Sequence, residues 1–455
     1  MNYEDFIDKK TSISGSFGFE PTFMPTMAFD FQKSLITWAV NKGRAALFAD
    51  CGMGKTLMEL AFGQNVVERE NKPVLLLTPL AVGAQTVKEA EKFGIESVRS
   101  LDGKHDGKAR VVVANYERLH LFNPSDFAGT ICDESSILKN FDGVTKEAVT
   151  NFMLKQKFRL LCTATAAPND FIELGTSSEA LGYLGYMDMV GKFFKKQGAT
   201  ISRKDENRAG VYRFRGHAER DFWRWVCGWA RAIRKPSDLG FDDGILTLPP
   251  LVTEEHIVKT DKPAEGMLFS MEAVGLQEQR SERSRTVQER CELASEIANK
   301  SNKPVIQWCH LNSESSILKK LSPDFVEVSG NNSDEEKEES FEAFISGQAR
   351  GLISKPSIAG FGLNFQHCAH QTFFPSHSFE QYYQAVRRSW RFGQKRPVHI
   401  DVIASEGERG VLRNLNRKAE AAEKMFSELV SLMNDELILK TKPKQNEKPT
   451  IPDWI

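Results

Sequence analysis

The chain has 455 residues, of which 40% are hydrophobic and 27% are charged, and its formal net charge is −1. This length suggests about three domains or two large ones, and the composition is ordinary for a soluble globular protein. Because the chain is nearly neutral, any nucleic-acid binding must come from a local basic patch and not from global attraction.

Targeting and cysteine signals predict a reducing, cytoplasmic setting. No apolar run reaches the roughly 20 residues of a membrane span, and residues 1–5 lack the basic and apolar regions of a secretory signal. The seven cysteines are scattered without a Cys-x-x-Cys pair, and three of them lie in apolar, strand-like runs. We therefore expect free, buried thiols and no membrane partner.

The first part of the chain predicts an α/β domain over residues 25–175. Residues 1–24 show no clear period and are expected to form an N-terminal arm, and a helix is predicted over 33–40. Apolar runs then alternate with helix-like stretches, which predicts a parallel sheet with ligands at the carboxyl ends of its strands. The predicted strands are 45–49, 74–78, 111–114, 130–132 and 160–163, and the helices include 82–93 and 144–155.

The stretch Ala49–Thr56 has the form of a phosphate loop between a predicted strand and a predicted helix. Strand, loop and helix together direct backbone N–H groups at one anionic site, and Gly52 and Gly54 let the backbone approach a phosphate closely. Lys55 is expected to reach the β- and γ-phosphates of ATP, and Thr56 is expected to hold Mg²⁺. The other loop residues assigned to nucleotide binding are Asp50, Cys51 and Met53.

Residues 176–247 break the alternation and are predicted to form a basic and aromatic helical insertion. Between Lys192 and Lys235, thirteen Lys and Arg residues stand against four acids, an excess of nine positive charges. Such a patch suits the backbone of a nucleic acid. Trp225 and Trp229, spaced i and i+4, are interpreted first as the core of a small subdomain, with base stacking as the alternative.

The second half of the chain predicts another α/β domain, over residues 301–439. A Leu-Pro-Pro-Leu stretch marks an inter-domain joint, and residues 248–300 are expected to be a linker with helices. The predicted strands are 305–309, 325–328, 351–354, 371–374 and 398–402, and the helices are 313–321, 335–344, 379–390 and 410–434. Residues 440–455 are expected to form a flexible tail.

Asp133 and Glu134 follow an apolar run about eighty residues after the phosphate loop. At the end of a strand beside that loop, Asp133 would complete the Mg²⁺ shell and Glu134 would align or deprotonate the attacking water. An isolated Asp-Glu pair is usually a solvated turn, but the apolar run and the order of the motifs favour the catalytic interpretation. Thr163 and Thr165 end the next apolar run, and their hydroxyls are expected to hydrogen-bond to these acids.

Gln384, Arg388 and Arg391 share one face of a predicted helix. Guanidinium groups on one face suit bidentate contact with a γ-phosphate, as arginine fingers acting across a domain cleft. For an arbitrary helix the alternative is a solvated basic face. Ahead of this helix, the glycine turn at 360–364 would let the backbone come close to a ligand or to the other domain.

These motifs, in this order, resemble the Swi/Snf-related ATP-dependent DNA translocases of helicase superfamily two, over residues 29–403. Phe31-Gln32 is similar to the family's adenine-reading Gln motif, and Ala49–Thr56 to its Walker A loop. Residues 133–140 resemble its DEAH-box segment and 163–169 its third motif. Residues 354–365 and 384–394 resemble motifs five and six.

The resemblance implies two RecA-like parallel-sheet lobes, with the helical insertion between them and ATP–Mg²⁺ in the cleft. It implies that Phe31, Gln32, Gly362 and Gln384 contact ATP, that Arg388 and Arg391 close from the second lobe, and that Asn115 contacts DNA. Hinge motion about residues 248–262 would move the lobes along DNA. Contacts to the DNA backbone carry no sequence information, so binding is expected to be sequence-tolerant and salt-dependent.

Two residues depart from the family pattern. Ser136 replaces a His, and Arg387 stands where an Asp is usual before the first finger. No chromodomain, bromodomain, nuclease or zinc module accompanies the motifs. A compact chain with this insertion and a terminal Pro-x-Trp is similar to small bacteriophage or bacterial members, which places it in the cytoplasm of a bacterial cell.

We therefore expect a monomeric DNA-dependent ATPase that couples ATP hydrolysis to movement on DNA. Two alternatives stay open: a strand-separating helicase acting on forks or RNA, and a non-catalytic nucleotide-binding clamp or scaffold. Within the insertion, DNA contacts are assigned to Lys196, Arg203, Arg213 and Arg215. Trp454 in the tail is expected to dock on a protein partner or on the chain's own lobe.

Overall fold

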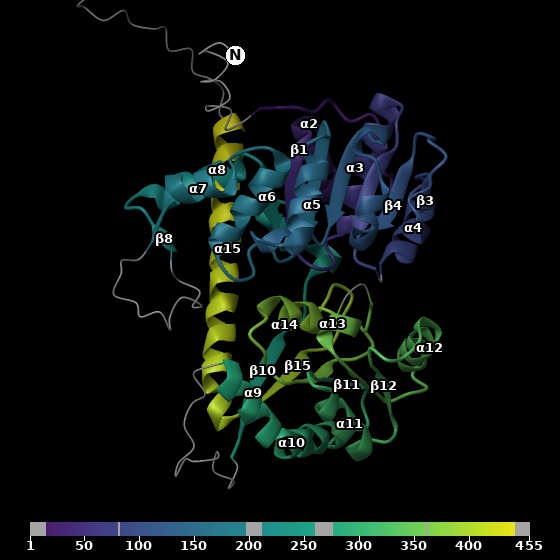
Figure 1. The fold of residues 1–455 in the computed structure, drawn as a ribbon, viewed down its shortest axis with the longest axis vertical. Coiled ribbons are helices and arrows are strands. Elements are labelled where there is room, and N and C mark those ends of the chain that lie inside the picture. Colours follow the sequence, from purple (N-terminus) through teal and green to yellow (C-terminus); the bar gives the residue numbers. More distant parts are fainter. Residues whose placement is uncertain (1–14, 81, 197–211, 260–275, 361–362, 442–455) are drawn as a thin grey trace, which may run out of the picture.

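The computed structural model describes residues 15–80, 82–196, 212–259, 276–360 and 363–441. The predictions for Arg203, Gly362, Trp454 and most of the N-terminal arm concern residues outside these ranges. The described chain forms two α/β lobes, one above the other in Figure 1, with a long helix, α15 (Arg409–Thr441), beside both. In these ranges, no helix combines the length and the apolar character that crossing a membrane requires.

The first lobe is built on a sheet whose described strands all pair in parallel. In spatial order they are β3 (Ser97–Arg99), β4 (Val111–Asn115), β2 (Val74–Thr78), β5 (Gly129–Asp133), β6 (Phe158–Thr163), β1 (Arg44–Ala49) and β9 (Ala230–Ile233). The central strands are buried on both faces, which explains why the sequence shows them as continuous apolar runs.

Helices cover both faces of this first sheet. On one face lie α2 (Asp30–Lys42), α3 (Lys55–Glu70) and α4 (Gly83–Lys92), and on the other lie α5 (Val144–Met153) and α6 (Leu174–Leu181). Alternate residues of β1 point to opposite faces: Ala45 and Leu47 join the core beneath α2 and α3, whereas Ala46 and Phe48 join the other core.

Part of the predicted insertion belongs to this first sheet. β9 pairs with β1 in parallel, with Ala46 opposite Ala230. Before it come α7 (Tyr186–Phe193), the antiparallel strands β7 (Phe194–Lys196) and β8 (Tyr212–Phe214), and α8 (Ala218–Cys227). The segment therefore extends the first lobe, in place of the expected helical insertion between the lobes, because an edge strand and a hairpin use its apolar residues.

The tryptophans of this segment are core residues. Trp223, Trp225 and Trp229 are 1%, 3% and 0% exposed, and Trp225 and Trp229 pack edge to face with ring centroids 5.5 Å apart. The core interpretation of Trp225 and Trp229 is confirmed.

The second lobe is also built on a sheet of described strands that all pair in parallel. In spatial order they are β10 (Leu251–Val258), β15 (Val398–Ser405), β14 (His370–Phe373), β11 (Val305–Trp308), β13 (Gly351–Ser354) and β12 (Phe325–Val328). Its helices are α9 (Leu276–Arg285), α10 (Val287–Asn299), α11 (Asn312–Leu321), α12 (Asp334–Ile345), α13 (Pro356–Ala359) and α14 (Phe379–Val386). The predicted pair of parallel α/β lobes is confirmed.

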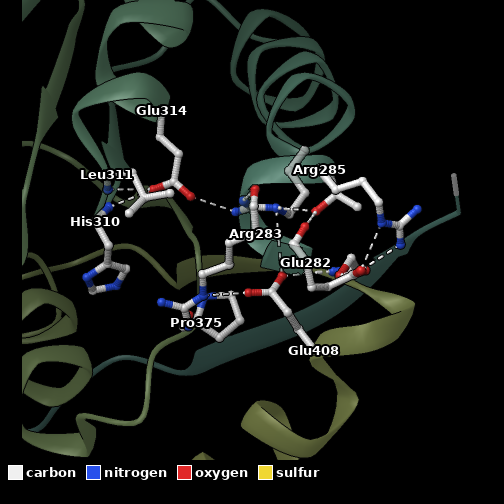
Figure 2. A network of polar contacts seen from close by, with 11 residues as sticks. Glu282, Arg283, Arg285, His310, Leu311, Glu314, Pro375 and Glu408 are labelled. Atoms are coloured by element: carbon white, nitrogen blue, oxygen red, sulfur yellow. Dashed lines mark hydrogen bonds and ion pairs between the residues drawn. The ribbon is translucent and has the colours of Figure 1, made fainter. Parts of the chain in front are cut away.

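Buried ion pairs hold the root of α15 in the second lobe (Figure 2). Glu408, just before α15, is fully buried and accepts a hydrogen bond from Arg283 Nε at 2.8 Å. Arg290, also fully buried, lies 3.7 Å from Glu408 and donates to Glu314 at 2.8 Å. Removing one member of such a buried network would leave a charge without a partner. The network therefore holds Glu408, and with it the first turn of α15, against the second lobe.

The sequence assigned this helix to the second lobe alone. In the structure, the C-terminal half of α15 packs on the first lobe. Met425, Phe426, Leu429 and Met433 are buried in the core that also contains Trp225. In Figure 1 the yellow helix runs from the second lobe along the side of the first. The helix therefore connects the two lobes, and we call it the connecting helix.

We expect Leu429→Ala to lower the free energy of unfolding by about 2 to 5 kcal/mol, because it removes a fully buried side chain from the contact between α15 and the first lobe. Chemical denaturation followed by tryptophan fluorescence measures this change. Ser427→Ala on the exposed side of the same helix is the control and should stay within about 0.5 kcal/mol of the parent. Equal stability of Leu429→Ala and the parent would contradict the packing of α15 on the first lobe.

Candidate nucleotide-binding cleft

The phosphate loop connects the carboxyl end of β1 to the start of α3. Gly52 and Gly54 have left-handed backbone conformations, with φ of +90° and +79°. A Cβ at Gly54 would lie 2.3 Å from Gln32 Nε2, and one at Gly52 would lie 2.6 Å from the ring of Phe392 in the second lobe. Both positions therefore require glycine, for conformation and for space.

Lys55 opens α3 and turns its side chain back into the loop. Its Nζ donates a hydrogen bond to the carbonyl oxygen of Ala49 at 3.1 Å. Burial lowers the pKa of Lys55, but the nearby Cys51, Glu134 and Asp133 outweigh burial and raise it overall. The ammonium group thus stays protonated beneath the loop, where a phosphate would meet it.

Asp133 and Glu134 stand at the carboxyl end of β5, beside the loop. Burial and then the adjacent Glu134 raise the pKa of Asp133 to about 6, against the opposing influence of Lys55. A bound cation would favour the ionised carboxylate. Glu134 has a left-handed φ of +54°, a strained conformation for a residue with a side chain, of the kind that gathers at functional sites.

Of the two threonines predicted to hydrogen-bond to the acids, one does so. Thr163 Oγ1 donates to Glu134 Oε1 at 2.8 Å, as expected. Thr165 does not reach the acids, because its backbone N–H donates to Thr163 Oγ1 at 3.0 Å and its own hydroxyl is turned into the protein. β6 ends at Thr163, so Thr165 lies beyond the strand and the sheet does not hold its side chain beside the acids.

Glu59 is a residue of this site that the sequence interpretation missed. It lies one helical turn after Lys55 on α3 and is 1% exposed. Burial and then the Asp133 carboxylate raise the pKa of Glu59 well above its usual range, so both disfavour a negative charge on Glu59. The available signal was an acid inside the apolar run Leu57–Phe62.

The predicted adenine-reading residues lie at the start of α2, against the loop. Gln32 Nε2 donates to the Met53 carbonyl at 2.9 Å, and Gln32 Oε1 accepts from the Phe29 N–H at 2.9 Å. Phe31 is buried and stacks on Phe29 with ring centroids 5.9 Å apart. Gln32 therefore links the start of α2 to the loop through the two ends of its amide, while contact with a base stays a prediction.

Gln384 and Arg388 come from the second lobe and reach this loop. Arg388 Nη2 lies 3.0 Å from Gln384 Oε1 and 4.0 Å from Cys51 Sγ, and its Nη1 donates to the Leu363 carbonyl at 3.1 Å. Burial and the neighbouring Arg388 lower the pKa of Arg391. Two crowded guanidinium groups of the second lobe, facing the predicted phosphate loop of the first, have the chemistry to bind an anion between the lobes.

The helix that carries Gln384 is shorter than predicted. α14 ends at Val386, and Arg387 is its C-terminal cap. Arg388 and Arg391 therefore lie in the turn after the helix. This turn brings them to the cleft, whereas the sequence predicted that they share one helix face. The predicted association is present, but by a different local structure.

The two departures from the family pattern contact the opposite lobe. Arg387 and Tyr383 both contact the Asp50 carboxylate in the phosphate loop. Ser136 Oγ donates to Glu380 Oε1 at 2.5 Å, and Lys139 pairs with the same carboxylate. Each of these two residues thus makes a polar contact with the other lobe: Arg387 with Asp50, and Ser136 with Glu380.

The predicted DNA contacts lie in two different environments. Lys196, Arg213 and Arg215 are exposed on or beside the β7–β8 hairpin, and Arg215 Nε also donates to the Phe194 carbonyl at 2.7 Å. Asn115 is 2% exposed at the end of β4, away from that surface. The structure therefore leaves the hairpin cations available to a ligand and buries Asn115.

Comparison with known proteins gives a partial match. Residues 288–393, from the first turn of α10 to just beyond α14, match the helicase conserved C-terminal domain. Among solved structures, the chain is similar to the Sulfolobus solfataricus SWI2/SNF2 ATPase core in complex with dsDNA, at 17% identity and a TM-score of 0.42, over 92% of this chain and 98% of that one. The ATPase core domain of the same organism gives 16% identity and a TM-score of 0.40, over 85% and 90%. No curated protein sequence matches the chain.

Proposed function

We propose that the protein is a DNA-dependent ATPase that hydrolyses ATP in the cleft between its lobes and moves along DNA, a compact translocase of the Swi/Snf-related type from a bacterium or bacteriophage. The observation that carries the proposal is the meeting of Arg388, from the second lobe, with the phosphate loop of the first. The helicase C-terminal match over residues 288–393 supports the same assignment, because it contains Arg388 and Arg391.

The chemistry follows from the positions of the cleft residues. The loop N–H groups and Lys55 would bind the phosphates, while Thr56 and Asp133 offer the hard oxygen ligands that suit Mg²⁺. When bound, Mg²⁺ would neutralise charge on the β- and γ-phosphates. Glu134, oriented by Thr163, would align the attacking water and accept its proton. Arg388 and Arg391 would stabilise the charge that develops on the γ-phosphate.

Coupling to DNA rests on contacts between the lobes and on the basic hairpin. Asp50 and Glu380 each accept contacts from the opposite lobe, so a change at the loop is transmitted directly to the second lobe. Exposed Lys196 and Arg213 would hold phosphates of the DNA backbone without reading bases. Closing and opening of the cleft would then shift one lobe along the DNA relative to the other.

We expect Arg213→Glu with Arg215→Glu to reduce DNA-stimulated ATP hydrolysis about tenfold or more at physiological salt, because each reversal replaces attraction to a phosphate by repulsion. Hydrolysis without DNA should be unchanged, since the hairpin lies outside the cleft. The same reversal at exposed Lys88 and Lys108 is the control. Full stimulation of the hairpin variant would remove the hairpin from the DNA site.

A triplex-displacement assay tests movement on duplex DNA directly. ATP-dependent displacement of a third strand, without unwinding of a fluorescent fork, would support a duplex translocase. Fork unwinding would instead favour a strand-separating helicase. ATP binding without turnover on any nucleic acid would favour the clamp or scaffold, and each of the last two outcomes overturns the proposal.

A further inference from the structure

A second cluster of chemically active side chains lies in the second lobe, away from the cleft. Glu254 and His256 are two residues apart on β10, so they point to the same face of the sheet. Asp401 on the neighbouring strand β15 is the register partner of Glu254. His370 opens β14, the next strand along, so three adjacent strands supply the cluster.

The polar atoms of this cluster converge on Asp401. His256 Nε2 lies 2.6 Å from Asp401 Oδ1, and His370 Nε2 lies 2.7 Å from Asp401 Oδ2. One ligand atom from each of Glu254, His256 and Asp401 lies within 4.8 Å of the others. Among the described residues, no other three His, Cys, Asp or Glu side chains come this close together. Asp401 is thus fixed on both oxygens by imidazoles.

The surroundings leave this cluster open to a small ligand. The side chains of His256, His370 and Asp401 are 29%, 22% and 11% exposed. A cavity of about 490 Å³ reaches the cluster and is lined by Glu254, His370 and Asp401. Glu254 is exposed and makes no ion pair or side-chain hydrogen bond within the part of the chain that the structure describes. Its carboxylate is therefore available to a ligand.

We propose that Glu254, His256 and Asp401 bind a divalent transition metal, with Zn²⁺ as the best fit, and that His370 positions Asp401 from outside the ligand set. One imidazole and two carboxylates are ligands that Zn²⁺ accepts, and three protein ligands leave a fourth position for water. Carboxylates that bind a metal are themselves hydrogen-bonded by groups outside the ligand set, and His370 is placed to do this for Asp401.

The geometry requires only small side-chain movements. Ligand atoms at about 2.0 to 2.1 Å from a tetrahedral Zn²⁺ lie about 3.3 Å from one another. His256 and Asp401 are closer than this in the hydrogen-bonded pair, so each would rotate slightly outward, and the imidazole would release the proton from Nε2. The ligands stand on neighbouring paired strands, which already hold their backbones in place.

The site would fasten β10 to the second lobe. β10 follows the joint at residues 248–250 directly and is an edge strand held by β15 alone among the described strands. A metal that joins Glu254 and His256 to Asp401 adds a link across this pair. Because a ligand that binds only the folded state stabilises it, Zn²⁺ at a hundredfold excess over its Kd should raise Tm by about 5 °C or more.

Metal binding to the chelator-treated full chain tests the proposal. Equilibrium dialysis against Zn²⁺ with elemental analysis should give one tightly bound metal per chain, and Co²⁺ should give the visible absorption of a tetrahedral site. His256→Asn, Asp401→Asn and Glu254→Gln should lose this metal, while His370→Asn should weaken binding about 10- to 100-fold. His120→Asn, at an exposed histidine in the first lobe, is the matched control and should bind fully.

Two outcomes would overturn the site. One is parent protein without stoichiometric metal, which would leave the cluster as a hydrogen-bonded His–Asp–His group. The other is full binding by Asp401→Asn or Glu254→Gln, which would place the metal elsewhere. Glu254 is exposed, so its variant remains informative if a change at Asp401 prevents folding. Neither result depends on ATP hydrolysis.

Discussion

Glu134→Gln is expected to bind ATP with unchanged affinity and to lose about two to four orders of magnitude in the rate of phosphate release. The amide has the size of the carboxylate and can still accept from Thr163, but it cannot take a proton from water. Single-turnover phosphate release measures the rate, and a fluorescent ATP analogue measures binding.

The control for this variant is Glu91→Gln, at an exposed glutamate of α4, which should behave as the parent. Undiminished phosphate release by Glu134→Gln would contradict the assignment of the general base.

Arg388→Lys is expected to lower kcat by about three to five orders of magnitude with little change in KM. The guanidinium is held by Gln384 and the Leu363 carbonyl beside Cys51, and a lysine cannot reproduce its planar, forked contacts. A fall in kcat at constant KM would show that the group acts on the transition state and not on ground-state binding.

Arg409→Lys, at an exposed arginine of the same lobe, controls for the loss of a guanidinium elsewhere and should leave kcat unchanged. If Arg388→Lys instead raised KM at constant kcat, Arg388 would be a binding residue. In that case the lobes would meet around the nucleotide without sharing in hydrolysis.

The buried strands were the part of the fold that the sequence predicted best. β2 and β13 begin and end at the predicted residues, because inner strands covered on both faces show as apolar runs. The edge strands β9 and β10 escaped prediction. β10 is half exposed and includes Glu254 and Glu255, so its sequence is that of a linker, and only its pairing with β15 makes it a strand.

The grouping of the candidate site residues was predicted best for those that come from the motifs of one lobe. The loop, Asp133, Glu134 and Thr163 lie together as expected because parallel strands end at the same edge of a sheet. Across the cleft, the approach of Arg388 to the loop was predicted, but the contact of Arg387 with Asp50 was not, because it depends on how the two lobes dock. Glu59 was missed because its partner in space, Asp133, is far from it in the sequence.

The central claim is that ATP is hydrolysed by both lobes together and that DNA drives the cycle. The most direct measurement is the steady-state ATPase rate of the full chain against duplex DNA, single-stranded DNA, branched DNA and RNA, beside Arg388→Lys. The account predicts a rate that rises with DNA in the parent and stays at background in Arg388→Lys. Equal rates with and without every nucleic acid, or full activity in Arg388→Lys, would contradict it.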